Sequence, residues 1–194
     1  MKLRTSLAVL TLGALALTST PLWASSRPAA PESLALTSYK ISTRITASRR
    51  LAQLGTNARQ VRRLAARLQS LDMQGNGNFW QYDAHVLNQA RSTVNAMDRD
   101  LRALERLEPS AAPWQQDAIR REAPSVVELT GHTQDAIKYL ASHEDALFAP
   151  SYRDDAEYMY RDAARIVKSV NQFEEFNDAR RQVRQLGSAL RISS

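Results

Sequence analysis

Apolar residues recur at steps of three and four through four long stretches of this chain, and three short breaks separate the stretches. Such steps place side chains along one side of an α-helix, because the helix completes a turn every 3.6 residues. The spacing predicts helices over about residues 34–72, 79–107, 113–148 and 151–187. The stripes that define them are Ile41, Ile45, Ser48, Leu51, Leu54, Ala58, Val61, Ala65 and Leu68; Trp80, Ala84, Leu87, Arg91, Val94, Met97, Leu101 and Leu104; Ile119, Val126, Thr130, Thr133, Ile137, Leu140 and Leu147; and Ala156, Met159, Ala163, Ile166, Val170, Phe173, Phe176, Val183 and Leu186.

Each break is short and rich in residues that interrupt helices, at Gly75–Asn78, Pro109–Pro113 and Ala149–Ser151. Short connections make successive helices neighbours that run in opposite directions. We therefore expect an all-α fold, an antiparallel up-down-up-down four-helix bundle with long helices. Pro124 falls inside the third helix, where we expect a kink or a fresh start, because proline lacks the backbone N–H.

The first residues are typical of an export signal rather than of folded structure. Lys2 and Arg4 precede an apolar run from Leu7 to Leu17, which is too short to span a bilayer. We expect a signal peptide at residues 1–24, a flexible leader at 25–33, the bundle at 34–187 and a C-terminal tail at 188–194. The mature chain would then lie in a periplasm or outside the cell, without a transmembrane anchor.

Composition excludes several classes of function. The chain has no cysteine, so thiolate catalysis and thiolate metal sites are excluded. Its net charge of +6 falls to +4 when Lys2 and Arg4 leave with the signal, since no acidic residue leaves with them. That excess is spread among interleaved acids, whereas a nucleic-acid interface concentrates its basic residues, so we expect no nucleic-acid partner.

Several segments resemble a set of small exported helical proteins of uncharacterised role. They are Pro113–Ile119 followed by Pro124, the pair Ala136 and Ile137, Pro150–Arg153, and Trp80 with Ala84, Leu87 and Asn88. The resemblance covers about residues 79–180. It implies export and a helical bundle, and it brings no activity, cofactor or site residue with it.

The connection between the first two helices follows the twelve-residue calcium-loop pattern in outline. Asp72 stands at its first position, Asn76 at its fifth and Asp83 at its twelfth. Gln74 at the third position and the short Asp83 in place of glutamate depart from the pattern. These departures predict weak affinity, with a dissociation constant on the order of 10⁻⁴ to 10⁻³ M. The alternative is a polar turn whose Asn78 caps the second helix.

The histidines suggest a second metal site. Counted from the predicted helix ends, His85 and His143 lie at the same height near one end of the bundle. Glu144 adjoins His143, and Asp155 could approach from the fourth helix, so a transition metal could bind there. Surface histidines are the alternative, because both lie one residue away from their stripes. His132 is mid-helix, at a different height.

The sequence contains no nucleophile elbow, phosphate loop or zinc-protease helix, so we expect no enzymatic activity and no cofactor. Arg180 and Arg184 are predicted to share an end of the bundle with Lys40 and Arg44, where an anionic ligand or acidic partner could bind. The leading interpretation is an exported, non-enzymatic bundle that binds another envelope protein or an anionic ligand. The alternative is a bundle that carries calcium, a transition metal or another cofactor.

Overall fold

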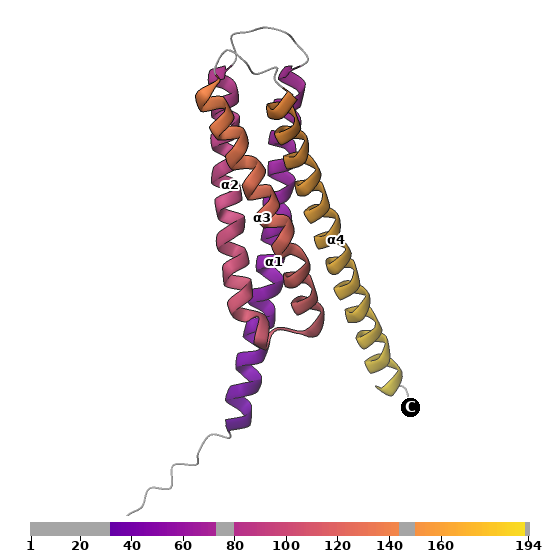
Figure 1. Ribbon diagram of the computed structural model, residues 1–194. Helices are drawn as coiled ribbons and strands as arrows, with labels where there is room; N and C mark the ends of the chain where they lie inside the picture. The colour runs from indigo at the N-terminus through magenta and orange to yellow at the C-terminus, as the bar shows by residue number, and fades with distance from the viewer. Residues whose placement is uncertain (1–31, 73–79, 144–149, 193–194) are drawn as a thin grey trace, which may run out of the picture.

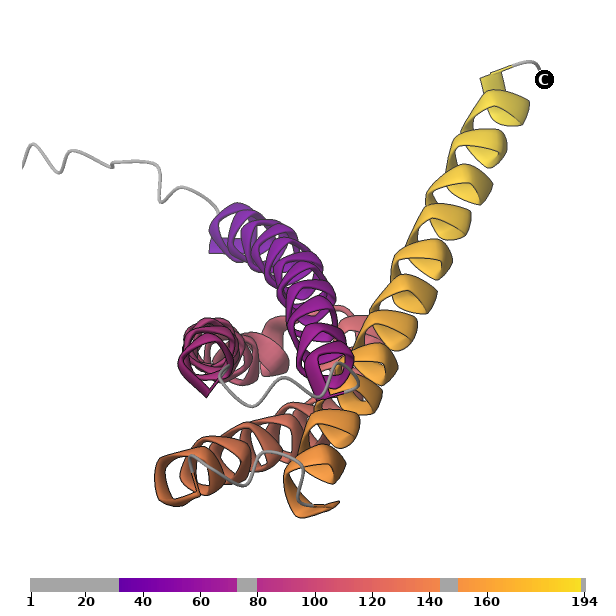
Figure 2. The same cartoon turned by 90° about the horizontal axis from the view of Figure 1, so that it is seen from above.

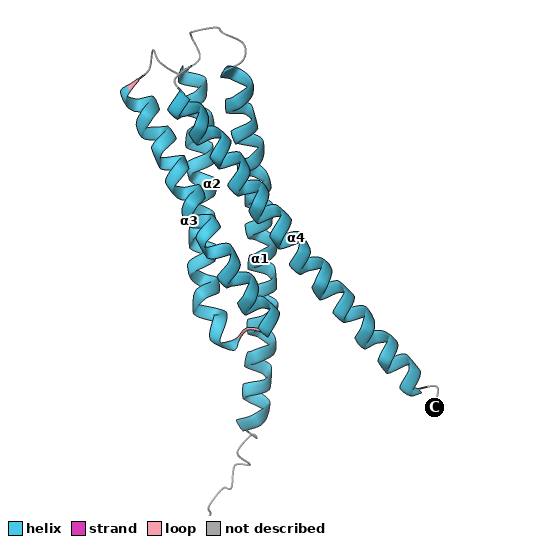
Figure 3. Ribbon diagram, turned by 45° about the vertical axis from the view of Figure 1, so that its right-hand side comes forward, coloured by secondary structure: helices cyan, strands magenta, loops and turns pink. Residues whose placement is uncertain are grey.

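The computed structural model describes residues 32–72, 80–143 and 150–192. In these ranges the chain forms four α-helices, α1 (Glu32–Asp72), α2 (Trp80–Leu107), α3 (Pro113–Ser142) and α4 (Pro150–Ile192). A short 3₁₀ helix, η1 (Glu108–Ser110), joins α2 to α3. The four helices pack against one another and these ranges contain no strand (Figures 1 and 3), which confirms the predicted all-α class.

The helices pack in a ring. α1 packs against α2 and α4, and α3 packs against the same two helices, so the apolar core lies among all four. Seen from above, α1 and α4 lean away from each other (Figure 2). The beginning of α1 and the last part of α4 therefore extend beyond the body of the bundle in different directions (Figure 1). None of the described helices has a segment that is both apolar and long enough to cross a membrane.

Regular heptad spacing accounts for the buried faces of α2 and α3. In α2 the buried residues follow alternating steps of three and four: Leu87, Ala90, Val94, Met97, Leu101 and Leu104. Ala90 therefore takes the inward position that we predicted for Arg91, which is exposed. In α3 the buried series is Ile119, Glu122, Val126, Leu129, Thr133, Ala136 and Leu140, so the spacing also brings a glutamate into the core.

α1 and α4 lie close together at Gly55. A Cβ atom added there would lie 2.8 Å from Cγ1 of Val170 and 3.3 Å from its Cβ atom. Both distances are shorter than side chains tolerate without movement, so only glycine allows the backbone of α1 this near to α4. The contact lies at the last part of α4 that remains in the core, because Val170 is buried and the residues after Phe173 are not.

The predicted core stripe of α4 is wrong beyond Phe173. Its buried residues are Ala156, Met159, Ala163, Ile166 and Val170. Continued at the same spacing, the inward positions after Phe173 are Asn177, Arg180 and Arg184. Polar and charged groups do not stabilise this face by burial, so α4 leaves the bundle. Phe176, Val183 and Leu186, which we predicted in the core, are 51%, 69% and 65% exposed.

The first part of α1 differs from the prediction in the same way. Ile41 and Ile45 are more than half exposed, while the buried face runs through Thr43, Ala47 and Leu51. Each isoleucine lies two residues from a buried position, which turns it by about 200° around the helix toward solvent.

Some helix ends also differ from expectation. α3 ends at Ser142 with His143 as its C-terminal cap, rather than near residue 148. It continues through Pro124, which is exposed, so the fresh start that we predicted as one of two alternatives is wrong, and the kink stays a prediction. α4 continues past Gly187 to Ile192.

Candidate functional site

A cavity lined by aromatic and arginine side chains lies where α4 leaves the bundle next to the beginning of α3. Its volume is about 870 Å³. We call it the aromatic-arginine cleft, and its walls are formed by Pro113, Trp114, Asp117, Arg120, Arg121, Gln172, Phe173, Phe176 and Arg180. Three arginines and one aspartate line it, so the lining is positively charged.

Gln115 fixes the beginning of α3, and with it the position of Trp114. The side-chain Oε1 of Gln115 accepts a hydrogen bond from the N–H of Ala112 at 2.9 Å. Its Nε2 donates to the carbonyl of Arg44 at 2.7 Å and to the hydroxyl of Ser48 at 2.9 Å. Gln115 is buried, so these bonds join the start of α3 to α1 in a region shielded from water.

Arginine side chains lie against the aromatic rings of the cleft. The guanidinium carbon of Arg121 is 5.3 Å from the ring centre of Phe173, and that of Arg180 is 5.7 Å from the ring centre of Phe176. Both distances are within the range of cation–π contacts. Arg120 forms an ion pair of 2.6 Å with Glu108 of η1. The cleft thus presents cationic groups held beside apolar surface.

A second, smaller cleft lies between α1 and α4, with a volume of about 310 Å³. Trp114 and Phe173 line both cavities. The same segment of α4 therefore has a cavity on each side. The other residues that line the smaller cleft are Ser48, Arg49, Leu51, Ala52, Val170, Glu174, Asn177, Asp178 and Arg181.

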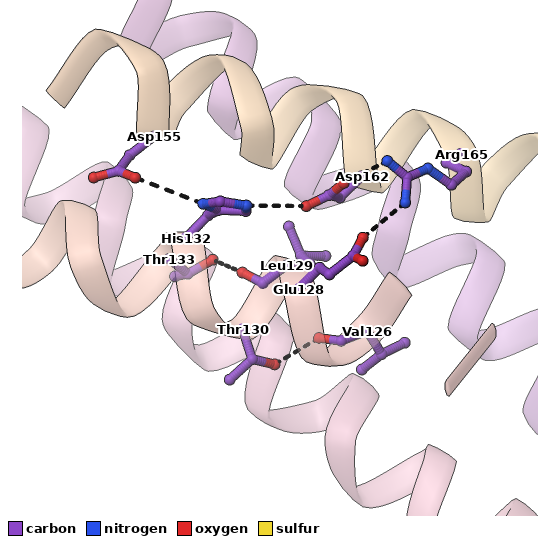
Figure 4. A network of polar contacts seen from close by, with 9 residues as sticks. All are labelled: Val126, Glu128, Leu129, Thr130, His132, Thr133, Asp155, Asp162 and Arg165. Carbon is purple, nitrogen blue, oxygen red and sulfur yellow. Dashed lines mark hydrogen bonds and ion pairs between the residues drawn. The ribbon is translucent and has the colours of Figure 1, made fainter. Parts of the chain in front are cut away.

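A cluster of charged groups joins α3 to α4 nearer the beginning of α4 (Figure 4). His132 lies between two carboxylates of α4, with its Nδ1 atom 3.6 Å from Asp155 and its Nε2 atom 3.8 Å from Asp162. Arg165 binds Asp162 at 3.1 Å and Glu128 at 2.7 Å. Burial raises the pKa of both Asp155 and Asp162 above the ordinary value, and the charge of Arg165 partly offsets the rise at Asp162.

The structure places the predicted histidines on the surface. His85 is exposed, and its Nε2 atom is 2.8 Å from the amide nitrogen of Gln89 on the same helix. His143 is exposed and stacks on Tyr139 with ring centres 4.4 Å apart. Asp155 instead contacts His132, which we predicted to lie at a different height in the bundle from His85 and His143.

Glu144 lies outside the described residues. Over residues 32–72, 80–143 and 150–192, no group of three or more histidine, cysteine, aspartate or glutamate side chains is arranged to hold a metal ion.

Only the two ends of the predicted calcium loop, residues 72 and 80–83, are among the described residues. Asp83 is buried, and its Oδ2 atom accepts a hydrogen bond of 3.1 Å from the hydroxyl of Tyr152 on α4. This carboxylate therefore joins the beginning of α2 to the beginning of α4. Asp72 ends α1, and Asn76 lies outside the described residues. Ion binding by the loop stays a prediction.

Glu122 of α3 is a buried carboxyl that we did not predict. It is 1% exposed, and its Oε1 atom has no hydrogen-bond partner within the described part of the chain. Burial raises the pKa of Glu122 to about 7, although the hydroxyl of Ser169 and the charge of Arg121 partly offset this rise. The spacing could have revealed it, since Ile119, Glu122 and Val126 follow the heptad steps.

Comparison of this chain with protein-family models, with curated proteins and with solved structures gives no match. Its function is therefore inferred from its own residues.

Proposed function

We propose that this chain is an exported, non-enzymatic helical bundle that binds an acidic segment of another envelope protein in the aromatic-arginine cleft. The observation that carries the proposal is the cleft itself, in which Arg121 and Arg180 lie against Phe173 and Phe176 beside Trp114. Tryptophan and arginine are among the residues that contribute most to protein interfaces. A partner with carboxylates beside apolar side chains complements both features of the lining.

The arginines favour an acidic partner through their position. Arg121 and Arg180 are exposed, and among the described residues that line the cleft Asp117 is the only acidic one. A guanidinium beside a ring can still donate hydrogen bonds to a carboxylate through the N–H groups that the ring does not contact. The phenylalanine rings and Trp114 would cover the apolar side chains of the same segment.

The antiparallel up-down-up-down order is part of this proposal, and contacts between opposite parts of successive helices support it. Arg50, in the first half of α1, forms an ion pair of 2.7 Å with Asp100, near the end of α2. Tyr139, near the end of α3, stacks on Tyr152, at the beginning of α4, with ring centres 5.9 Å apart. Export is supported by the basic start and short apolar run of residues 1–24.

Calorimetric titration with a synthetic peptide tests the binding site. The probe is a helical peptide with glutamates on one side and leucine and phenylalanine on the other, and a second peptide carries lysines in place of the glutamates. We expect the acidic peptide to bind and the lysine peptide not to bind. Arg121→Gln and Arg180→Gln should each weaken binding about five- to tenfold, whereas Arg91→Gln, an exposed change on α2, should not.

Equal heats from both peptides, or equal losses in Arg121→Gln and Arg91→Gln, would overturn the assignment of the cleft. Cell fractionation with N-terminal sequencing tests export separately. We expect a product that begins near Ser25 outside the cytoplasm. A cytoplasmic product that retains Met1 contradicts that part of the proposal.

A further inference from the structure

The part of α4 that leaves the bundle has an apolar stripe of its own. Phe176, Ala179, Val183, Leu186 and Leu190 follow steps of three, four, three and four. This series is one residue out of phase with the core stripe that ends at Val170 and Phe173, so it lies about 100° around the helix from the buried face. We call residues 176–190 the α4 extension.

Apart from Asn177, which is half-buried, the described side chains of the α4 extension, those of residues 176–189, lie in solvent. From residue 178 to residue 189 every side chain is exposed, including Val183 and Leu186. A helix of about fifteen residues is only marginally stable in water when nothing packs against it. A regular apolar stripe along such a helix is typical of a segment that another helix covers.

The residues of the stripe favour pairing with an identical helix. With Phe176 and Val183 at heptad position a, Ala179 and Leu186 fall at position d. A β-branched residue at a combined with leucine at d favours two parallel strands. Val183 at position a and Leu186 at position d match this combination, so the second heptad of the exposed face favours a parallel two-stranded pair.

Charges beside the stripe complement each other in the same arrangement. Glu175 occupies position g and Arg180 position e, five residues later. In a parallel two-stranded coiled coil a residue at g faces the residue at e of the following heptad on the other strand. Glu175 of each copy would therefore face Arg180 of the other, and twofold symmetry would give two such ion pairs.

We propose that two copies of this chain associate through residues 176–190 of α4, as a parallel, in-register two-stranded coiled coil. This goes beyond the proposed peptide binding, since it concerns a second copy of the chain and a face that begins at Phe176 and Arg180 of the cleft and continues past them to residue 190. The stripe is only about two heptads long, so the area that it can bury lies at the low end for a specific interface and the association should be weak.

Sedimentation equilibrium of the purified protein between about 1 and 500 µM tests association. We expect a monomer–dimer equilibrium, and the double variant Val183→Glu with Leu186→Glu should remain monomeric at every concentration. Gln185→Glu adds negative charge to the same helix away from the stripe, so it should dimerise like the wild type. Neither Val183 nor Leu186 lines the aromatic-arginine cleft, so loss of dimer in this variant is separable from loss of peptide binding.

A wild-type protein that stays monomeric, or a dimer that survives in the double variant, would overturn the proposal. Orientation is tested by an introduced cysteine, because the chain has none of its own. Ala179→Cys should form a disulfide-linked dimer under mild oxidation, since position d faces its own copy in a parallel pair, and Gln185→Cys should not. A dimer in which Ala179→Cys fails to cross-link faster than Gln185→Cys contradicts the parallel arrangement.

Discussion

Replacing Glu122 with glutamine should remove a pH-dependent loss of stability. Burial raises the pKa of this carboxyl from 4.5 to about 7 in the folded protein, so it keeps its proton up to neutral pH there. In the unfolded chain it loses the proton near its ordinary value. Its contribution to stability is therefore complete below about pH 4.5 and is lost as the pH rises through about 7.

The size of the effect follows from the pKa. Each step of one in pKa corresponds to about 1.36 kcal/mol, so the rise to about 7 makes ionised Glu122 cost up to about 3 kcal/mol in unfolding free energy. Glu122→Gln keeps the size and shape of the side chain and cannot ionise. The variant should therefore exceed the wild type in stability by up to about 3 kcal/mol at pH 8, and this advantage should vanish near pH 4.5.

Urea unfolding followed by circular dichroism at pH 4.5, 6, 7 and 8 measures this difference. Glu105→Gln is the matched control, since Glu105 is an exposed glutamate on α2. The burial of an amide at position 122 costs the same free energy at every pH. The test is therefore how the difference in unfolding free energy between the wild type and Glu122→Gln changes with pH. If the wild type and Glu122→Gln show parallel pH profiles, Glu122 does not titrate as a buried acid and the reasoning fails.

Three further changes test the packing of the helices, each by urea unfolding. Gly55→Ala should destabilise the protein by about 1–3 kcal/mol because its Cβ would meet Val170, and adding Val170→Ala should recover part of the loss; an unchanged midpoint would refute the close approach. Tyr152→Phe should cost about 1–2 kcal/mol by removing the hydrogen bond to buried Asp83, and no loss would mean that the bond contributes nothing. Gly131→Ala should stabilise α3 by about 0.5–1 kcal/mol, since a Cβ there meets no atom within 4 Å, whereas a decrease would contradict the open space seen at this position.

The number, type and approximate bounds of the helices follow from apolar spacing. The spacing does not show which side of α1 near its beginning, or of α4 near its end, points to solvent. In the predicted first stripe, Ile45, Ser48, Leu51 and Leu54 follow successive steps of three, which drift around a helix of 3.6 residues per turn. The same drift occurs at Val170, Phe173 and Phe176. Strictly alternating steps of three and four residues lead to polar residues at the inward positions after Phe173. Such steps would therefore have shown where α4 leaves the core.

The candidate site was less accessible to sequence reasoning. Asp155 was predicted to approach a metal site formed with His85 and His143, but it contacts His132 instead. The predicted heights assume that the third helix ends near residue 148, whereas α3 ends at Ser142. The height of each residue of α3, measured from that end, is therefore shifted by about 9 Å. The cleft was not predicted because its shape depends on the angle at which α4 departs, and no local pattern sets that angle.

The contact between Gly55 and Val170 makes the angle of α4 sensitive to a single position. α4 continues for 22 residues beyond Val170, to Ile192, which is about 33 Å of helix. A tilt of α4 by about ten degrees at this contact would move its far end by about 6 Å. The residues of α4 that line both cavities would move with it, so a larger side chain at position 55 should change the width of both.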